Sequence, residues 1–453
     1  MSLPSARSSA STPPHAPRTL DAGLLLVVLA VAFESMAVGT VLPRVAEDLR
    51  GLPLYGWASS AFLLSSLFGA VAFGALSDRR GLARGAALCL AVFALGLLVA
   101  GLAPSMLVFV LGRLVQGFGA GGLGALPFAV ISTRYPEASR APMLAAVSGA
   151  WLLPALVGPL VASLIADAWS WRAVFWGLIP ALALVAPLCV LPLRGGERAA
   201  PGTAERPLLW PALGLTLAAG ALVEGLRRED ALSLPLTLLG VAGVLLASRP
   251  LFPAGMWRLA PGLPAMLMVR GWAAFGLLGA NAFLPLALHE LRGLSLTQAG
   301  WLLSVGGATW TLGSWAQAGL ERRLGPGSRP ARIRLGMVGV SVGLLVTALA
   351  ALGELPLGAA YAGWFVAAFG MGVGYNSNSL LALLSVGADA SGRLSGQLAN
   401  IEVLMTAVAA GVGGALLARA QPLSRAFALA FLVTLLGSLV TWVAAARVGK
   451  RGG

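Results

Sequence analysis

The chain has 453 residues, of which 58% are hydrophobic and 11% are charged, and its formal net charge is +14. Soluble domains carry about 25% charged residues, so this composition excludes an ordinary soluble protein. The basic residues are spread over the loops instead of forming one patch, and we therefore expect no nucleic-acid partner.

Hydropathy along the chain predicts an all-α polytopic membrane protein, because long apolar runs recur at the length that a helix needs to cross a bilayer. Residues 1–21, rich in Ser, Pro and Ala, are expected to form a disordered cytoplasmic tail. The fourteen predicted spans are about 22–42, 54–76, 85–103, 106–131, 141–166, 172–192, 208–226, 231–248, 263–288, 297–320, 333–353, 357–385, 395–418 and 424–446. The seventh and eighth are short and separated only by the charged residues 227–230, so twelve or thirteen spans is the alternative count.

The distribution of Lys and Arg predicts the orientation. With the N-terminus inside, 21 of the 31 basic residues fall in inner segments, eight fall in outer segments and two lie within spans. By the positive-inside rule both termini are expected in the cytoplasm, with the protein in the cytoplasmic (inner) membrane.

An internal repeat relates the two ends of the chain. At an offset of 244 residues, Gly56-Trp57, Gly69, Arg79 and Gly81 recur as Gly300-Trp301, Gly313, Arg323 and Gly325, and at an offset of 253, Arg140 and Gly158 recur as Arg393 and Gly411. We therefore expect two parallel six-helix halves, 22–193 and 261–446, with a linker and two extra spans in 194–260 and a short cytoplasmic tail in 447–453. Arg322 stands at the counterpart of Asp78, so only the first loop is expected to retain an acid.

Four segments carry a resemblance to a known family: GALSDRRGLAR (Gly74–Arg84), LGRLVQGFGAGG (Leu111–Gly122), FESMAVGTVLP (Phe33–Pro43) and WRAVFWGLIP (Trp171–Pro180). They resemble signatures of the major facilitator superfamily, most closely its fourteen-span drug:proton antiporters, in which an Asp usually stands at the position of Glu34. In the fifth span, Ala162 and Ser163 replace the paired glycines of the antiporter signature, which leaves the direction of transport open.

The resemblance implies the major facilitator fold and a monomeric, proton-coupled transporter that works by alternating access. Export of lipophilic or amphipathic, in some cases cationic, compounds is the first expectation, and lipid export or solute import by the same fold is the alternative. The expected partners are a small-molecule substrate, protons and membrane lipid, with no cofactor or metal beyond the proton gradient. An enzyme is not expected, because no nucleophile–base pair, P-loop or HExxH motif occurs; a receptor would not need buried charges.

Charged residues inside spans are costly and mark function or pairing. Glu34, Arg113 and Glu402 are the candidate proton-coupling residues, and which of the two acids is the main carrier is left open. Glu224 and Arg270 are expected to extend toward the membrane surface from helix ends, without a functional role.

Three further groups complete the predicted sites. The substrate cavity is expected to be lined by Met36, Phe128, Trp151, Asn281, Tyr375, Asn376 and Asn378. The resemblance implies a conformational latch at Gly74, Asp78, Arg79, Gly81 and Arg84. Gly158 and Pro159 are expected to allow a kink in the fifth span.

Overall fold

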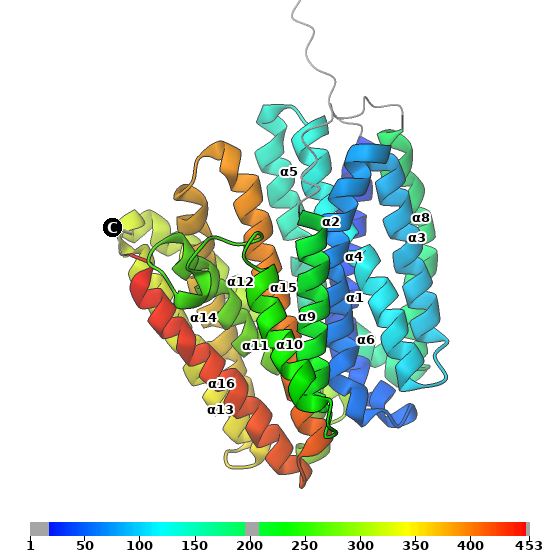
Figure 1. Ribbon diagram of the computed structural model, residues 1–453, viewed down its shortest axis with the longest axis vertical. Helices are drawn as coiled ribbons and strands as arrows, with labels where there is room; N and C mark the ends of the chain where they lie inside the picture. Colours follow the sequence, from blue (N-terminus) through cyan, green and yellow to red (C-terminus); the bar gives the residue numbers. More distant parts are fainter. Residues whose placement is uncertain (1–17, 195–207, 450–453) are drawn as a thin grey trace, which may run out of the picture.

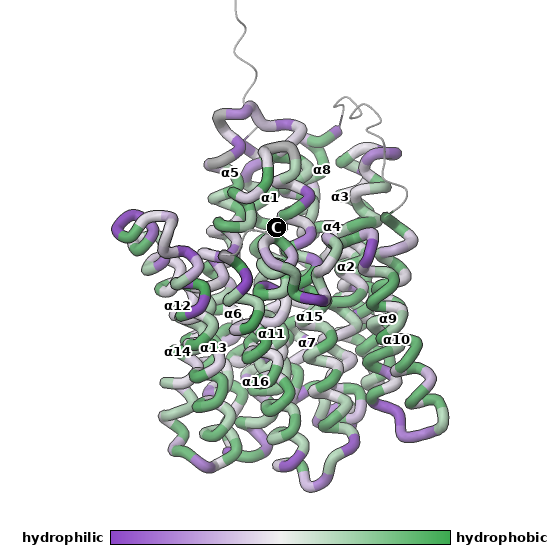
Figure 2. Tube along the Cα trace, turned by 60° about the vertical axis from the view of Figure 1, so that its left-hand side comes forward, coloured by the Kyte–Doolittle hydropathy of each residue, from purple (hydrophilic) through white to green (hydrophobic). Residues whose placement is uncertain are grey.

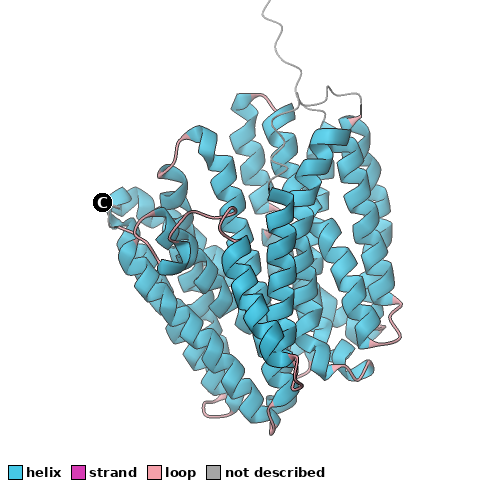
Figure 3. Cartoon of the chain, in the orientation of Figure 1, coloured by secondary structure: helices cyan, strands magenta, loops and turns pink. Residues whose placement is uncertain are grey.

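The computed structural model describes residues 18–194 and 208–449, and within them every regular element is a helix and none is a strand (Figure 3). The α-helices are α1 (Arg18–Asp48), α2 (Tyr55–Arg80), α3 (Leu82–Gly101), α4 (Met106–Arg134), α5 (Glu137–Gly149), α6 (Leu152–Ala168), α7 (Trp171–Trp176), α8 (Leu178–Val190), α9 (Leu209–Arg227), α10 (Ser233–Ala247), α11 (Leu263–Arg292), α12 (Leu296–Leu324), α13 (Arg329–Leu352), α14 (Leu357–Leu384), α15 (Ala388–Arg419) and α16 (Leu423–Arg447). Short 3-10 turns lie at Leu52–Leu54, Leu191–Leu193, Met256–Arg258 and Pro326–Ser328.

Each predicted span coincides with one helix, except that the fifth is divided into α5 and α6 and the sixth into α7 and α8. Twelve segments of the described chain are long and apolar enough to cross a membrane. The 15-residue α10 is shorter than a usual span. Helix α12 also falls outside the twelve and carries polar side chains such as Thr309 and Gln317. The multi-pass helical fold is thus confirmed, and the count of fourteen is not.

The hydrophobic residues follow the lengths of the helices, and the hydrophilic residues gather toward their ends (Figure 2). Helix α1 begins at Arg18, so residues 18–21, expected in the tail, form its first turn. Residues 1–17 of the predicted tail lie outside the described residues, as do most of the predicted C-terminal tail and the start of the predicted linker. The predicted domain boundaries stay predictions.

Helices α1–α8 and α11–α16 form two groups that approach each other toward the bottom of Figure 1 and separate toward the top. The groups meet where α2 packs on α15 and α6 packs on α12. Ser60 Oγ donates a hydrogen bond to the Ala407 carbonyl (2.8 Å), and Thr297 Oγ1 donates one to Asp167 Oδ2 (2.6 Å). Both bonds lie toward the end where α1 finishes and α2 begins, which is the predicted outer side.

Helices α9 and α10 pack together, and α9 contacts both α2 and α15, so the inserted pair lies against both groups (Figure 1). Thr216 Oγ1 donates to the Leu64 carbonyl of α2 at 3.2 Å. On the other side, the Arg419 guanidinium donates to the Arg227 carbonyl and to Ser233 Oγ, each at 3.2 Å. Beyond the end of α9, hydrogen bonds from Arg228 hold the pKa of Asp230 below its ordinary value.

Helices α2 and α4 approach so closely that glycine is required between them. A Cβ atom on Gly121 would lie 1.9 Å from the Ser66 carbonyl oxygen, and one on Gly117 would lie 2.1 Å from the Phe62 carbonyl oxygen. Small residues allow this kind of backbone contact between membrane helices. The contact fixes the side of α4 that carries Arg113 against α2.

We expect Gly121→Val to prevent folding, because the valine side chain would clash with the backbone of α2 at Ser66, and backbone atoms cannot move away as a flexible side chain could. Gly124→Val is the matched control, since a Cβ there meets no atom within 4 Å. The measurement is the yield of monodisperse protein extracted from membranes, compared between the two variants. Equal yields would show that α2 and α4 do not pack at this distance.

Candidate functional site

A buried ion pair joins α1 to α4 in the middle of the first helix group. Arg113 Nη1 donates to Glu34 Oε1, and the two side chains are only 4% and 1% exposed. The same nitrogen donates to Gln116 Oε1 at 2.7 Å, and Arg113 Nε donates to the Ala58 carbonyl of α2 at 3.2 Å. The guanidinium carbon also lies 4.1 Å from the centre of the Phe62 ring. The predicted Glu34 and Arg113 are thus brought together.

The two oxygens of Glu34 differ in their surroundings. Oε1 accepts from Arg113, whereas Oε2 is buried and has no hydrogen-bond partner among the described residues. An unpartnered anionic oxygen in a buried site is costly, and a proton on it removes that cost. The Arg113 guanidinium stays charged throughout, and it keeps Gln116, the Ala58 carbonyl and the Phe62 ring as partners when Glu34 is neutral.

A second ion pair lies in the other helix group, between α11 and α15. Arg270 donates to Glu402 Oε2 through Nε (3.1 Å) and Nη2 (2.8 Å), and Tyr375 Oη donates to the same oxygen at 2.5 Å. Arg270 Nη1 donates to Ser379 Oγ at 2.8 Å. The Arg270 and Glu402 side chains are 14% and 22% exposed, so this pair is more open than the first.

The expectation that Arg270 only extends toward the membrane surface is wrong, because its guanidinium turns inward to three partners on α14 and α15. Sequence reasoning missed this residue because it lies eight positions into α11, where an extended side chain is ordinary. A signal was available in the sequence: Arg270 and Glu402 are opposite charges in two different apolar spans, and neither has an oppositely charged residue nearby in its own span. Glu224 is also paired, with Arg227 (2.7 Å) and with the Trp57 indole N–H (3.0 Å).

The predicted cavity residues differ in their exposure. Phe128 and Trp151 are 54% and 40% exposed, while Met36 and Asn281 are half-buried. Their role in lining a substrate cavity stays a prediction.

The three remaining cavity candidates lie on α14. Tyr375 contacts Glu402, and the Asn376 amide donates to Ser314 Oγ of α12 at 2.7 Å. Asn378 is 1% exposed, and its amide donates to the Met266 carbonyl of α11 at 2.9 Å. Asn378 therefore packs between α14 and α11 instead of facing open space, and its amide N–H donates to a backbone carbonyl instead of to solvent.

The predicted latch residues lie around the turn between α2 and α3. Gly81 adopts φ 87°, a left-handed conformation that favours glycine, and it ends α2. Gly74, Asp78, Arg79 and Arg84 are exposed, and none of the three charged side chains forms an ion pair with a described residue. A latching role stays a prediction.

The corresponding turn of the second group does contain an acid, contrary to expectation. Glu321, one position before the counterpart of Asp78, accepts hydrogen bonds from Arg329 and Arg332 at the start of α13. The offset comparison aligned Arg322 with Asp78 and so passed over the neighbouring Glu321. Both turns therefore combine an acid with several arginines.

Helix α6 continues through Gly158 and Pro159, and the break in the predicted fifth span lies at residues 150–151. The Pro159 carbonyl is 3.0 Å from the place that a Cβ on Gly300 would occupy, so this part of α6 contacts α12. A kink at Gly158 and Pro159 stays a prediction.

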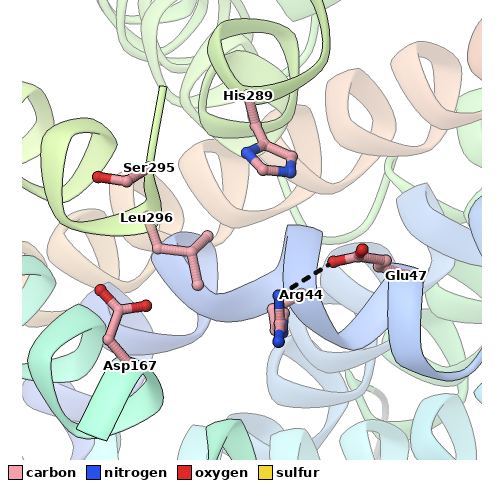
Figure 4. Close-up of a pocket in the computed structure, with 6 residues that line it drawn as sticks. All are labelled: Arg44, Glu47, Asp167, His289, Ser295 and Leu296. Atoms are coloured by element: carbon pink, nitrogen blue, oxygen red, sulfur yellow. Dashed lines mark hydrogen bonds and ion pairs between the residues drawn. The ribbon is translucent and has the colours of Figure 1, made fainter. Parts of the chain in front are cut away.

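A cavity of about 190 Å³ lies at the predicted outer ends of α1, α6, α11 and α12. Figure 4 shows its lining, which comprises Arg44, Glu47, Asp167, His289, Ser295 and Leu296. Arg44 Nη1 donates to Glu47 Oε2 at 3.4 Å, and His289 Nδ1 lies 2.8 Å from the Leu294 carbonyl oxygen. Sequence reasoning gave no signal for this cavity, because polar residues at span ends are ordinary. Across residues 18–194 and 208–449, no cluster of three or more His, Cys, Asp or Glu could hold a metal ion.

Twelve apolar helices in the described chain, an ion pair within each helix group and close packing through glycine accompany a match of residues 24–410 to the sequence model of the Major Facilitator Superfamily. The chain belongs to the Major Facilitator Superfamily. As a member, it is a multi-pass membrane transporter and not an enzyme.

Relatives of the facilitator include a probable multidrug-efflux transporter of Mycobacterium tuberculosis (strain H37Rv), which is 28% identical over 399 residues, covering 83% of this chain and 82% of that protein. Multidrug resistance protein 3 of Bacillus subtilis is 30% identical over 162 residues, covering 36% of this chain and 32% of that protein. Among solved structures, a bacterial homologue of the human lysosomal transporter Spinster aligns with a TM-score of 0.67 at 15% identity, covering 96% of this chain and 97% of that one.

Proposed function

We propose that this facilitator exports lipophilic or amphipathic compounds in exchange for protons, by alternating access of a site between the two helix groups. The observation that carries the proposal is the buried Glu34, which has one oxygen bound to Arg113 and the other without a described partner. Such a carboxyl can take up and release one proton while Arg113 holds it in place. The name of the mycobacterial relative supports efflux as the direction.

Exposed aromatic side chains at predicted cavity positions also support this substrate class. The predicted cavity residues include aromatic side chains such as Phe128 and Trp151, both substantially exposed. Apolar and aromatic linings with a few polar groups suit amphipathic ligands. On this proposal the protein acts as a monomer in the cytoplasmic membrane, with both termini inside, membrane lipid around it and the proton gradient as its only energy source.

Proteoliposomes with an imposed pH gradient test the proposal. The purified protein is reconstituted with a trapped pH-sensitive dye, and a lipophilic fluorescent cation such as ethidium is added on one side. We expect ethidium movement against its gradient when protons flow the other way, together with a change of internal pH. Ethidium movement that neither depends on nor changes the pH difference would overturn proton exchange. Movement in the same direction as the protons would instead show import.

A further inference from the structure

The turn that joins α12 to α13, at the predicted inner side, concentrates positive charge. Residues 321–334 contain one acid, Glu321, and five arginines: Arg322, Arg323, Arg329, Arg332 and Arg334. Each of the other predicted inner turns of the chain holds three arginines or fewer. An excess of basic residues spread over the inner side is enough to orient a membrane protein, so the charge in this one turn exceeds what orientation requires.

The one acid of this turn is already occupied. Glu321 Oε1 accepts from Arg329 and Glu321 Oε2 accepts from Arg332, so both carboxylate oxygens have a cationic partner. The other arginines of the turn are exposed and have no hydrogen-bond or ion-pair partner among the described residues: Arg322, Arg323 and Arg334. Three cationic side chains therefore remain uncompensated where α12 ends and α13 begins, and the partner that they lack is an anion.

An apolar side of α13 begins beside these charges. Leu335 is 71% exposed, and it is followed at spacings of three or four residues by the exposed Val338, Val342 and Leu345. This spacing places the four side chains on one side of the helix. Helix α13 packs on α11, α14 and α16 with its other sides, so this one stays open. Arg334 lies four residues before Val338 and therefore stands at the inner end of the same apolar side.

The two features together match one kind of molecule, which is anionic at one end and apolar along its length. A guanidinium group matches two oxygens of a phosphate, and clusters of arginine at the inner ends of membrane helices attract anionic lipids. We infer that the inner ends of α12 and α13 bind anionic phospholipid of the inner leaflet, with the phosphate at Arg322, Arg323 and Arg334 and an acyl chain along residues 335–345 of α13. The lipid site depends neither on the proposed proton exchange nor on the transported compound.

Lipid binding to the full-length protein in detergent tests the site. The delipidated protein is titrated with dioleoyl phosphatidylglycerol or with dioleoyl phosphatidylcholine, and native mass spectrometry measures the affinity for each. We expect phosphatidylglycerol to bind about tenfold or more tightly than phosphatidylcholine, since one arginine near an anionic lipid contributes about a fivefold gain. The triple variant Arg322→Gln/Arg323→Gln/Arg334→Gln should bind both lipids equally weakly. If the triple variant does not fold, Arg334→Gln alone should lose about fivefold in affinity for phosphatidylglycerol.

Arg80→Gln/Arg249→Gln/Arg258→Gln is the matched control, because it removes three exposed arginines from other predicted inner segments and changes the net charge equally. This variant should keep the preference for phosphatidylglycerol. Equal losses in the two triple variants would show attraction to the overall charge and would overturn the site, as would equal affinity of the wild type for both lipids. Glycerophosphoglycerol, the headgroup without acyl chains, should not displace the bound lipid at equal concentration. Displacement would show a phosphate site without a lipid component and would contradict the role of α13.

Discussion

Glu34→Gln is expected to abolish transport driven by a pH gradient, reducing it to the level of liposomes without protein. Glutamine is close to glutamate in size, and its carbonyl oxygen still accepts from Arg113 Nη1, so the geometry of the pair is retained. The amide cannot gain or lose a proton, however, and the Oε2 position no longer titrates. The loss should therefore affect coupling more than folding.

Counterflow with no pH gradient separates these effects. We expect the Glu34→Gln protein to exchange labelled for unlabelled substrate across the membrane, because that exchange requires no net proton movement. Glu137→Gln, which changes an exposed acid at the start of α5, should behave as the wild type in both assays. Uptake driven by the pH gradient at the wild-type rate in Glu34→Gln would exclude Glu34 as the proton carrier.

Arg113→Met is expected to destabilise the protein strongly, because it leaves Glu34 buried without its charged partner. Breaking a buried ion pair by removing one partner typically costs about 3–5 kcal/mol, while replacing both partners by neutral groups costs much less. The double variant Glu34→Gln/Arg113→Met should therefore melt at a higher temperature than Arg113→Met alone. The measurement is the apparent melting temperature in detergent of both variants and the wild type.

Arg425→Met provides the control, since this Arg is exposed at the start of α16. Its melting temperature should match that of the wild type. If the double variant melts no higher than Arg113→Met, the cost does not come from the unpaired Glu34, and the packing of Arg113 against Phe62 becomes the dominant contribution.

Much of this fold could be predicted because the bilayer imposes a length on every apolar run. The predicted spans coincide with helices or helix pairs, including those at the ends of the chain. The predicted span 297–320 also coincides with a helix, α12, but this helix is not among the twelve that are apolar enough to cross a membrane. It carries polar side chains such as Thr309 and Gln317, because helices surrounded by protein need not be apolar on all sides.

The site was predictable in part, and the limits have a physical cause. Glu34 and Arg113 could be identified singly, because each is a costly charge within an apolar span. The partners of Glu402 could not be identified from the sequence, because Arg270 and Tyr375 are 132 and 27 residues away and meet it only through helix packing. The same is true of Glu321, whose partners come from the following helix.

The position of α9 has a mechanical consequence. This helix is joined to α2 through Thr216 and Trp57, and its end is joined to α15 through Arg419. If the two helix groups rotate relative to each other at the outer side, α9 cannot follow both, so one set of these bonds has to break. The strength of the weaker set then contributes directly to the energy barrier for that rotation. The inserted helix pair is thus expected to slow the transport cycle, although it carries none of the residues proposed to bind the proton or the substrate.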